Sequence, residues 1–447
     1  MENPASMLNA FFNFDMRFIA VTIMFISYAI IFSEKVNRAI VALLGAVFMI
    51  IFGVLDQYTA IKSIDFNTIN LLMGMMIIVG ITERTGVFQF IAVWMAKRVR
   101  ANPRALLAVT AAITALLSGY VGNVTTALLI TPIIIQITRN LKVPSFPYLM
   151  LIIFACNIGG AATLIGDPPN ILIGSKLGLT FGDFIINMTP LSYFLMVVLI
   201  VAFDFIWGRK LYAEPADRAA IVIMKERDYL YDISLLKKSL FVLTLVILGF
   251  IFAHNMKLNT GTIAIIGASV LMFLYTLGDN HHEADEKMHS VFGRIDWVTI
   301  FFFAGLFVIV AGLEVTGLLE AIGHMFVEWT GGEEDRLIYT FLWSAAGVSM
   351  AIDNIPFVAT MVPIVETIEN TLGNREHMMP MWWALLMGAC YGGNGTIIAS
   401  SVNVVVAGIA ARERSPIGFF RFMVWGIPVT IASIAISSVY LYFRYLH

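Results

Sequence analysis

Residues 157–170 read NIGGAATLIGDPPN, and this polar interruption of an otherwise apolar segment decides the fold. The consecutive prolines Pro168 and Pro169 cannot sit inside a continuous helix, because each removes a backbone donor and clashes with the preceding turn. The sequence therefore predicts a split helix over 146–174 whose unwound middle leaves backbone groups free beside Asp167. Half-helix ends of this kind can bind ions or polar solutes at membrane depth.

A second interruption, GGNGTIIASSVN at residues 392–403, aligns without a gap with the first, so that Gly159 falls on Gly392 and Asn170 on Asn403. At nearly the same offset, further polar and turn residues coincide in pairs. They are Asp65 with Asp296, Gly74 with Gly305, Glu83 with Glu314, Gly86 with Gly317, Ser118 with Ser349, Asn123 with Asn354 and Pro132 with Pro363. The chain is therefore predicted to contain two copies of one unit, with interruptions at matching positions as in secondary transporters.

The composition describes a chain embedded in lipid. Of 447 residues, 59% are hydrophobic and 13% are charged, and the mean hydropathy is +0.85. In soluble domains, about a quarter of the residues are charged. The net charge is −2, and the sequence shows no cluster of basic residues that could bind a nucleic acid, so no nucleic-acid partner is expected. Both cysteines lie in apolar segments, which argues against a disulfide framework.

Apolar segments long enough to cross a membrane, about 20 residues each, divide the chain into two repeats. The first repeat (1–208) contains candidate spans 17–33, 37–55, 66–83, the split helix 146–174 and 189–208. The second repeat (239–447) contains 239–254, 260–277, 296–314, the split helix 380–410 and 419–444. Five crossings per repeat invert the second repeat relative to the first. The predicted fold class is an all-α polytopic membrane protein built from two inverted repeats.

One further block in each repeat is predicted to be a re-entrant helical hairpin. Residues 104–139 and 337–368 each consist of two apolar arms around a polar tip, and each arm is short for a full crossing. Backbone that turns at membrane depth is tolerated only where protein or water satisfies its polar groups. We therefore expect both tips to lie in the interior, beside the unwound parts of the split helices.

The placement of basic residues predicts the orientation. The linker 209–238 carries seven of them, which places it in the cytoplasm by the positive-inside rule. Both termini are then predicted outside the cytoplasm, in a multi-pass protein of the inner (plasma) membrane. Of the 28 Lys and Arg residues, all but Arg17, Lys62, Lys176, Lys257, Arg336, Arg375 and Arg444 fall on the cytoplasmic side.

Polar side chains in the broken segments are candidate ligands. Hydroxyl and amide oxygens suit a hard cation or a hydroxylated solute, although each single Asn or Thr could instead cap a helix. The candidates in the split helices are Thr163, Asn170, Asn394, Thr396 and Asn403. Apart from Arg104 and Arg139 at the ends of the first hairpin, no Lys, Arg or His lies in the two hairpins and the two split helices, which favours a neutral solute or a cation. A dicarboxylate or phosphate could still use helix N-termini and bound sodium.

Two acids inside apolar segments are the candidate carriers of the coupling ion, because ionisable groups in the membrane are costly and usually functional. Asp353, at the second hairpin tip, ranks first, and its counterpart in the first repeat is Gly122. Asp167 ranks second. Glu83 and Glu314 stand at span ends and are expected to be structural.

The cysteines Cys156 and Cys390 lie close to symmetry-related positions and are candidate soft ligands. The competing interpretation, a small residue that packs well, is favoured. No metal site and no cofactor are predicted.

These motifs resemble the ion transporter superfamily, in its arsenite-efflux, melanosomal P protein and sodium/proton antiporter branches. The resemblance rests on 123–126 (NVTT), 167–171 (DPPNI), 353–356 (DNIP) and 392–396 (GGNGT). It implies an inverted-repeat fold, a homodimer, and a transport core that moves against a scaffold. By analogy, the hairpin residues Asn123, Thr125, Thr126 and Asn354 join the substrate site. Relatives commonly carry an acid where this chain has Gly122, which favours proton over sodium coupling.

The predicted function is secondary active transport, with proton-coupled efflux of arsenite or antimonite as the leading hypothesis. A sodium/proton antiporter and an inorganic or organic anion transporter are the alternatives. An enzyme is not expected, because the one local cluster of catalytic residue types, 281–283 (HHE), stands in a charged loop. The expected partners are a small inorganic solute, a proton or sodium ion and the lipid bilayer. No ATP-binding loop is present, so an ATPase would have to be a separate subunit.

Overall fold

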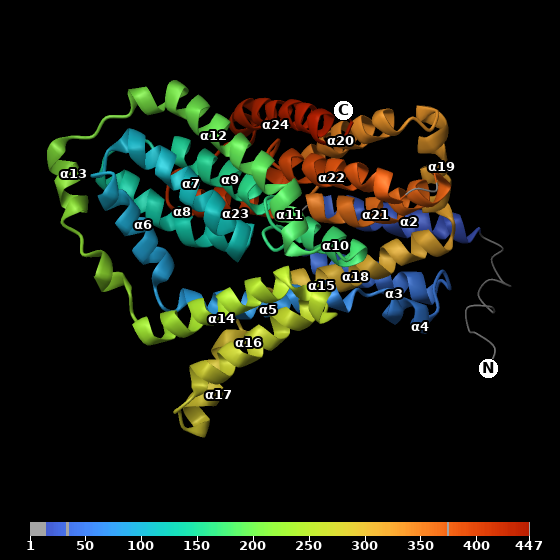
Figure 1. Cartoon of the computed structure of the whole chain (residues 1–447), viewed down its shortest axis with the longest axis horizontal. Helices are drawn as coiled ribbons and strands as arrows, with labels where there is room; N and C mark the ends of the chain where they lie inside the picture. The colour runs from blue at the N-terminus through green and yellow to red at the C-terminus, as the bar shows by residue number, and fades with distance from the viewer. Residues whose placement is uncertain (1–14, 33–34, 373–374, 447) are drawn as a thin grey trace.

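The computed structural model describes residues 15–32, 35–372 and 375–446, and within them every regular element is a helix (Figure 1). The first repeat forms α2 (Met16–Phe32), α3 (Arg38–Ile51), α4 (Gln57–Lys62), α5 (Phe66–Glu83), α6 (Val87–Arg98), α7 (Pro103–Val121), α8 (Asn123–Asn140), α9 (Phe146–Gly160), α10 (Pro168–Leu177), α11 (Phe181–Asn187) and α12 (Thr189–Ile206). Residues 1–14 and 447, at the outer ends of the two predicted repeats, lie outside the described residues. So does residue 33, the last residue of the first predicted span.

The linker and the second repeat complete the chain. The linker contains η1 (Gly208–Lys210), α13 (Pro215–Val222) and η2 (Glu226–Tyr229). The second repeat forms α14 (Ile233–Ile251), α15 (Ala253–Met256), α16 (Thr260–Thr276), α17 (His281–Phe292), α18 (Trp297–Val315), α19 (Leu318–Thr330), α20 (Glu334–Ala351), α21 (Asn354–Leu372), α22 (Arg375–Gly392), η3 (Ile397–Ala399), α23 (Ser401–Arg412), α24 (Phe419–Leu441) and η4 (Tyr442–Leu446). The all-helical fold class with two related halves agrees with the prediction.

The described residues include six helices that are long and apolar enough to cross a membrane, namely α5, α7, α12 with η1, α14, α18 and α24 with η4. Shorter apolar helices, among them α3, α9 and α16, lie beside them. The hairpin arms are longer than hydropathy indicated, because α7 alone is long enough to cross. The chain nevertheless turns back at Gly122, whose φ of +93° is a conformation that favours glycine.

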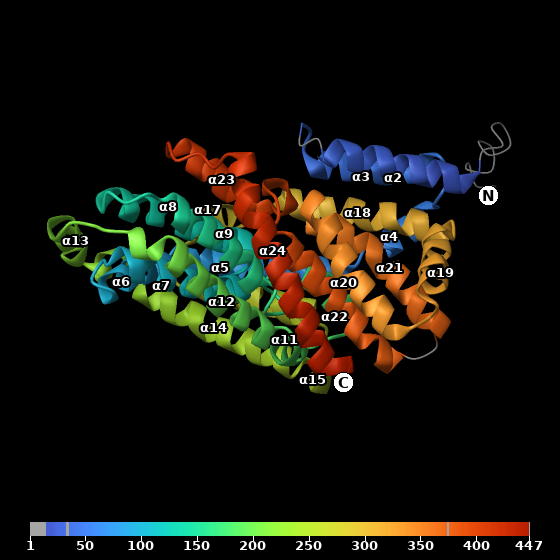
Figure 2. The same cartoon turned by 90° about the horizontal axis from the view of Figure 1, so that it is seen from above.

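Helices of one repeat pack directly against helices of the other. The first repeat's α5 packs against α16, and the second repeat's α18 packs against α3. A glycine permits each close approach: a Cβ on Gly74 would lie 2.6 Å from the Ala264 carbonyl carbon, and one on Gly305 would lie 2.5 Å from that of Ala42. Small residues at such crossings are typical of membrane helix packing. Figures 1 and 2 show the result, with α2 and α3 lying along second-repeat helices.

We call α2–α5 with α14–α18 the scaffold, and α7–α12 with α20–α24 the core. In the core, each hairpin packs on the first half of its own split helix, α7 on α9 and α20 on α22. The second hairpin arm reaches the other repeat, so that α8 contacts α23 and α21 contacts α10. The hairpin tips therefore meet both unwound segments at the centre of the core.

The linker closes the base of the first hairpin. Asp217 of α13 pairs with Lys142 at 3.0 Å, and the neighbouring Arg218 donates two hydrogen bonds, of 3.1 and 3.0 Å, to the Arg100 carbonyl oxygen. Arg100 and Lys142 adopt left-handed φ values of 51° and 55°, which cost a non-glycine residue about 1 kcal/mol each. We call these contacts, with the Lys97–Glu226 ion pair, the linker clasp.

Candidate functional site

Asp167 lies at the junction of both hairpin tips and the first unwound segment. The chain leaves α9 at Gly160 and re-enters helix at Pro168, which sets Asp167 in an extended conformation at the start of α10 with its side chain 1% exposed. The Asn123 amide nitrogen donates to Asp167 Oδ1 at 2.9 Å, and the Asn354 amide nitrogen donates to Oδ2 at 3.3 Å. One carboxylate thus joins two asparagines that are copies of each other.

Two other duplicated asparagines brace the unwound segments. The Asn170 amide nitrogen donates to the carbonyl oxygens of Gly160, Ala161 and Thr163, at 3.2, 3.2 and 2.7 Å. Its copy Asn403 donates to the carbonyl oxygens of Gly393 and Thr396, at 2.7 and 2.8 Å. These amides satisfy carbonyls that the broken helices leave unpaired. Their position supports a bracing role for two residues predicted to bind substrate.

The duplicated threonines tie each unwound segment to its hairpin. The Thr163 hydroxyl donates to the Gly119 carbonyl oxygen, and the Thr396 hydroxyl donates to that of Met350 at 2.7 Å. The hairpin tip adds a backbone bond of 3.1 Å from Asn123 N–H to the Gly166 carbonyl oxygen. Both threonine hydroxyls therefore already have protein acceptors.

A second polar cluster surrounds Asn157, which the sequence analysis did not single out. The Asn157 amide nitrogen lies 3.0 Å from both Asn394 Oδ1 and Asn403 Oδ1, and the Ser400 hydroxyl donates to Asn157 Oδ1 at 3.0 Å. In the alignment of the repeats, Asn157 corresponds to Cys390. The Asn394 amide nitrogen is buried without a partner in the described part of the chain.

The two thiols are consequently not equivalent. Cys390 takes the place of Asn157 and directs its Sγ to Asn170 Oδ1 at 3.6 Å. Cys156 directly precedes Asn157, and its carbonyl oxygen accepts a hydrogen bond of 2.6 Å from the Ser118 hydroxyl. Both are fully buried free cysteines.

An arginine reaches the second hairpin tip from outside the broken segments. Arg38, the first residue of α3, forms an ion pair of 3.3 Å with Asp353 Oδ2. It also donates to the Ser401 hydroxyl at 2.8 Å and to the Thr299 hydroxyl at 3.1 Å. The sequence showed a basic residue at the start of an apolar run, a pattern that usually reflects a helix end at the membrane surface.

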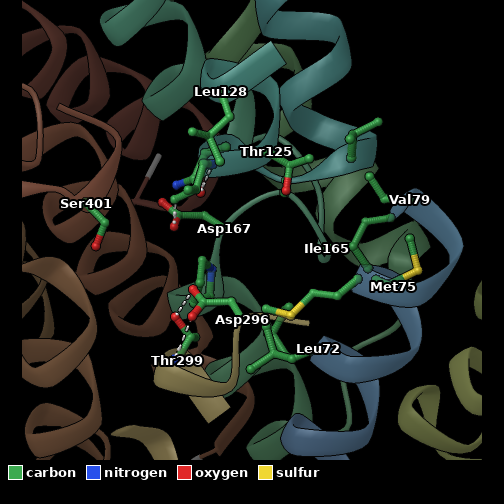
Figure 3. A pocket seen from close by; sticks show the side chains of 18 of the residues that line it. Leu72, Met75, Val79, Thr125, Leu128, Ile165, Asp167, Asp296, Thr299 and Ser401 are labelled. Carbon is green, nitrogen blue, oxygen red and sulfur yellow. Dashed lines mark hydrogen bonds between the residues drawn. The ribbon is translucent and has the colours of Figure 1, made fainter. Parts of the chain in front are cut away.

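A cavity of about 520 Å³ connects these groups (Figure 3). The apolar side chains of α5, among them Leu72, Met75 and Val79, lie across from Asp167 and Ser401. An ion pair between Glu83 and Arg294, with 2.5 Å between Oε2 and a guanidinium nitrogen, lies where α5 ends and α18 begins. Glu83 therefore lines the cavity.

Only some of the residues predicted for the site line this cavity. Asn123, Thr125, Asp167 and Asn354 do so, together with Arg38, Asp296, Thr299, Ser400 and Ser401. Thr126 is buried beside the tip, and its hydroxyl has no partner among the described residues. Asp353, the acid ranked first from the sequence, is not among the lining residues and lies against Arg38 instead. The remaining candidates, which are Thr163, Asn170, Asn394, Thr396, Asn403, Cys156 and Cys390, lie behind the cavity wall.

Comparisons with known proteins agree with this architecture. A family model described as "Citrate transporter" (CitMHS) matches residues 28–388. An uncharacterized transporter of Mycobacterium tuberculosis is 41% identical over 434 residues, covering 96% of this chain and 99% of that protein. The human P protein is 32% identical over 508 aligned positions, covering 95% of this chain and 59% of its own length.

Among solved structures, the crystal structure of the Alcanivorax borkumensis YdaH transporter is similar in fold. Its TM-score is 0.58 with 15% sequence identity, and the match covers 86% of each chain. At this identity the likeness concerns the fold alone.

Proposed function

This chain belongs to the CitMHS citrate transporter family of the ion transporter superfamily, and on that premise we propose that it couples proton movement to the export of a small uncharged polar solute. The family makes it a multi-pass membrane transporter and not an enzyme. Arsenite or antimonite, as the trihydroxy species, is the proposed solute. The observation that carries the proposal is the buried Asp167 carboxylate held by one amide donor from each hairpin tip.

Asp167 is the proposed proton carrier. An ionised carboxylate away from water is costly unless it is paired, and no ion pair to Asp167 forms among the described residues. An ionised carboxylate only accepts hydrogen bonds, whereas its protonated form donates one. Protonation removes the negative charge and turns one oxygen into a donor, which weakens the asparagine contacts and alters how the two hairpin tips are held. Asp353, ranked first from the sequence, has Arg38 as a counter-ion and follows Asp167 in this role.

The cavity lining favours a solute without net negative charge. It contains the carboxyl groups of Glu83, Asp167 and Asp296 and the guanidinium groups of Arg38 and Arg294. Acids thus outnumber bases, so a polyanion meets net repulsion. The hydroxyl and amide groups of Thr125, Asn123, Asn354, Ser400 and Ser401 can hydrogen-bond a trihydroxy solute without any charge.

An organic anion is the second candidate, and Arg38 is the observation that favours it. A guanidinium matches a carboxylate with two parallel hydrogen bonds, and the family description names citrate. To use Arg38, such a solute has to displace Asp353 from the 3.3 Å ion pair. A multiply charged anion gains one strong contact here and meets three carboxyl groups.

Uptake into everted membrane vesicles separates these functions. We expect a pH gradient to drive arsenite accumulation in vesicles with the wild-type protein. The gradient should drive none with Asp167→Asn, while Asp285→Asn, which changes an exposed acid of α17, behaves as wild type. Uptake of citrate but not arsenite would establish the anion function. Collapse of the pH gradient on adding sodium, with neither solute moved, would establish sodium/proton exchange.

The proposal includes a plasma-membrane location, a cytoplasmic linker 209–238 and a homodimeric assembly, without an ATPase subunit. Labelling of single introduced cysteines in the linker, from each side of sealed vesicles, tests the orientation. Transport by the purified protein alone in proteoliposomes tests independence from an ATPase.

A further inference from the structure

Arg38 connects the scaffold to the core through three side chains. On the scaffold, it donates to the Thr299 hydroxyl of α18 at 3.1 Å. On the core, it reaches the Ser401 hydroxyl at the start of α23 at 2.8 Å and Asp353 Oδ2 at the second hairpin tip at 3.3 Å. Ser401 in turn donates to the same Asp353 oxygen at 3.1 Å. One guanidinium therefore holds the hairpin tip and α23 against two scaffold helices.

A second contact holds the same hairpin along its flank. The Tyr28 hydroxyl of α2 lies 2.7 Å from the Thr360 hydroxyl and 3.2 Å from the Pro356 carbonyl oxygen, both on α21. Asp353 also caps α21, since its Oδ1 accepts the Ile355 N–H at 3.1 Å. The orientation of α21 is thus linked to the side chain that Arg38 binds.

The first hairpin has no such attachment. In the described part of the chain, none of the hydrogen bonds of α7 and α8 goes to α3, α5, α16 or α18. The cavity separates this hairpin from α5 instead, with Val124 and Leu128 on one wall and Met75 and Met76 on the other. The structure therefore has one hairpin seated on the scaffold and one hairpin apart from it.

We propose that Arg38 is a positioning residue that keeps the second hairpin closed on the scaffold, and that protonation of Asp353 releases it. This inference rests on the proposed proton coupling. The proton binds Asp353 from water, to which this side chain is 19% exposed, and it weakens both the ion pair with Arg38 and the Ser401 hydrogen bond to the same oxygen. Arg38 keeps its charge and its hydroxyl acceptors on Thr299 and Ser401, but it no longer attracts the hairpin tip by charge.

The surrounding charges suit this exchange. Asp353 faces Arg38 from α3 and Asp167 from α10, and Asp296 at the start of α18 acts through Thr299, whose hydroxyl donates to it at 2.5 Å. Lys176 and Glu366 form their own pair between α10 and α21, at 3.1 Å. In the described part of the chain, Arg38 forms an ion pair with Asp353 and not with Asp167, so a proton on Asp353 removes the charge that attracts Arg38 to the hairpin tip. Asp167 is then the acid of the solute site, and Asp353 is the acid that holds the second hairpin closed.

Accessibility of a cysteine at Thr360→Cys, in a Cys156→Ser and Cys390→Ser background, measures hairpin closure without any solute. Only the thiolate reacts with a water-soluble maleimide, so each labelling rate is divided by the rate of the SDS-unfolded protein at the same pH. We expect this relative rate to be low at about pH 8 and about tenfold higher at about pH 5, because one charge-assisted contact is lost. Arg38→Gln and Asp353→Asn should each label fast at both pH values. Arg38→Lys should restore the pH dependence, and Arg17→Gln, a scaffold arginine bound to the Thr316 carbonyl oxygen, should not alter it.

If the relative labelling rate of Thr360→Cys does not change with pH, the proposal is overturned, even if the Arg38 and Asp353 variants do not fold. So does a folded Arg38→Gln protein that keeps the pH dependence. The transport proposal fails independently: pH-dependent labelling in a protein that moves neither arsenite nor citrate supports the Arg38 contact and removes the solute assignment. Proton-driven arsenite uptake with pH-independent labelling does the reverse.

Discussion

The two hairpins are copies of one segment, yet they meet different partners. Each tip carries an asparagine that donates to Asp167, and each first arm donates a serine hydroxyl to its split helix: Ser118 at 2.6 Å and Ser349 at 2.7 Å. Beside the asparagine, however, the first tip has Gly122 and the second has Asp353, which binds Arg38. At the hairpin tips, the duplicated serines and asparagines therefore build the frame, and the ion pair forms at the position where the two copies differ.

The same division holds in the unwound segments. Asn170 and Asn403 make equivalent bonds to backbone carbonyls, whereas Asp167 corresponds to Ser400, and Cys390 to Asn157. Positions at which an inverted duplication has lost its symmetry are therefore the best candidates for coupling. In the unwound segments, Asn170 and Asn403 keep the symmetry and serve stability.

The largest expected effect is the loss of proton-driven flux in Asp167→Asn, by about 10²-fold or more, because an amide cannot carry the proton. Ser400→Ala, the change at the corresponding position, removes one hydrogen bond worth about 1 kcal/mol and should keep flux within about tenfold. Solute flux in proteoliposomes at fixed pH gradient measures both. An equal loss of flux in the two variants would mean that Asp167 has no role in transport that Ser400 lacks.

The next effect concerns stability and should be the same in both copies. Asn170→Ala and Asn403→Ala each leave buried carbonyls unpaired and open a small void, which should lower the free energy of unfolding by about 2–4 kcal/mol. Thermal unfolding of the purified variants, followed by loss of monodispersity, measures the change. A large difference between the two would show that one unwound segment matters more for stability than the other.

A smaller effect should separate the two hairpin tips. Asn123→Ala removes the 2.9 Å bond to Asp167 and should destabilise the protein by about 2 kcal/mol, whereas Asn354→Ala removes a 3.3 Å bond and should cost about 1 kcal/mol. The same unfolding assay ranks them. The reverse order would indicate that the second tip holds Asp167 more firmly than the distances suggest.

The smallest effect is expected for the thiols. Cys156→Ser with Cys390→Ser should leave flux within about twofold, because serine keeps a donor for Asn170 Oδ1 and fits the same space. Arsenite flux measured at several solute concentrations tests this. A large rise in the concentration needed for half-maximal flux would instead assign the thiols to solute binding.

The frame could be predicted from the sequence because its determinants are local. The prolines after Asp167 and the glycine pairs mark where helices break, and the duplication tells which breaks correspond. Asp167 is identified in this way. Family resemblance adds the hairpin residues, of which Asn123, Thr125 and Asn354 line the cavity and Thr126 does not.

The contacts between distant segments could not be predicted. Arg38 meets Asp353 only because α3 of one repeat packs on α18 of the other, and no periodicity within either segment reports that exchange. The interiors of the broken segments carry no cationic side chain, but Arg38 and Arg294 line the cavity from segments outside them. The sequence predicts Asn170 and Asn403 as ligands, whereas both amides donate to backbone carbonyls, a distinction that the sequence alone does not reveal.

The linker clasp also bears on how the chain is made. Its last side chain, Glu226, is synthesised before any residue of the second repeat, so the base of the first hairpin can close early. The partners of α3 and α5 arrive only with α18 and α16, which at about 5–20 residues per second means several seconds later. During that interval Ala42 and Gly74 have been translated but their packing partners have not, so lipid must cover these surfaces first.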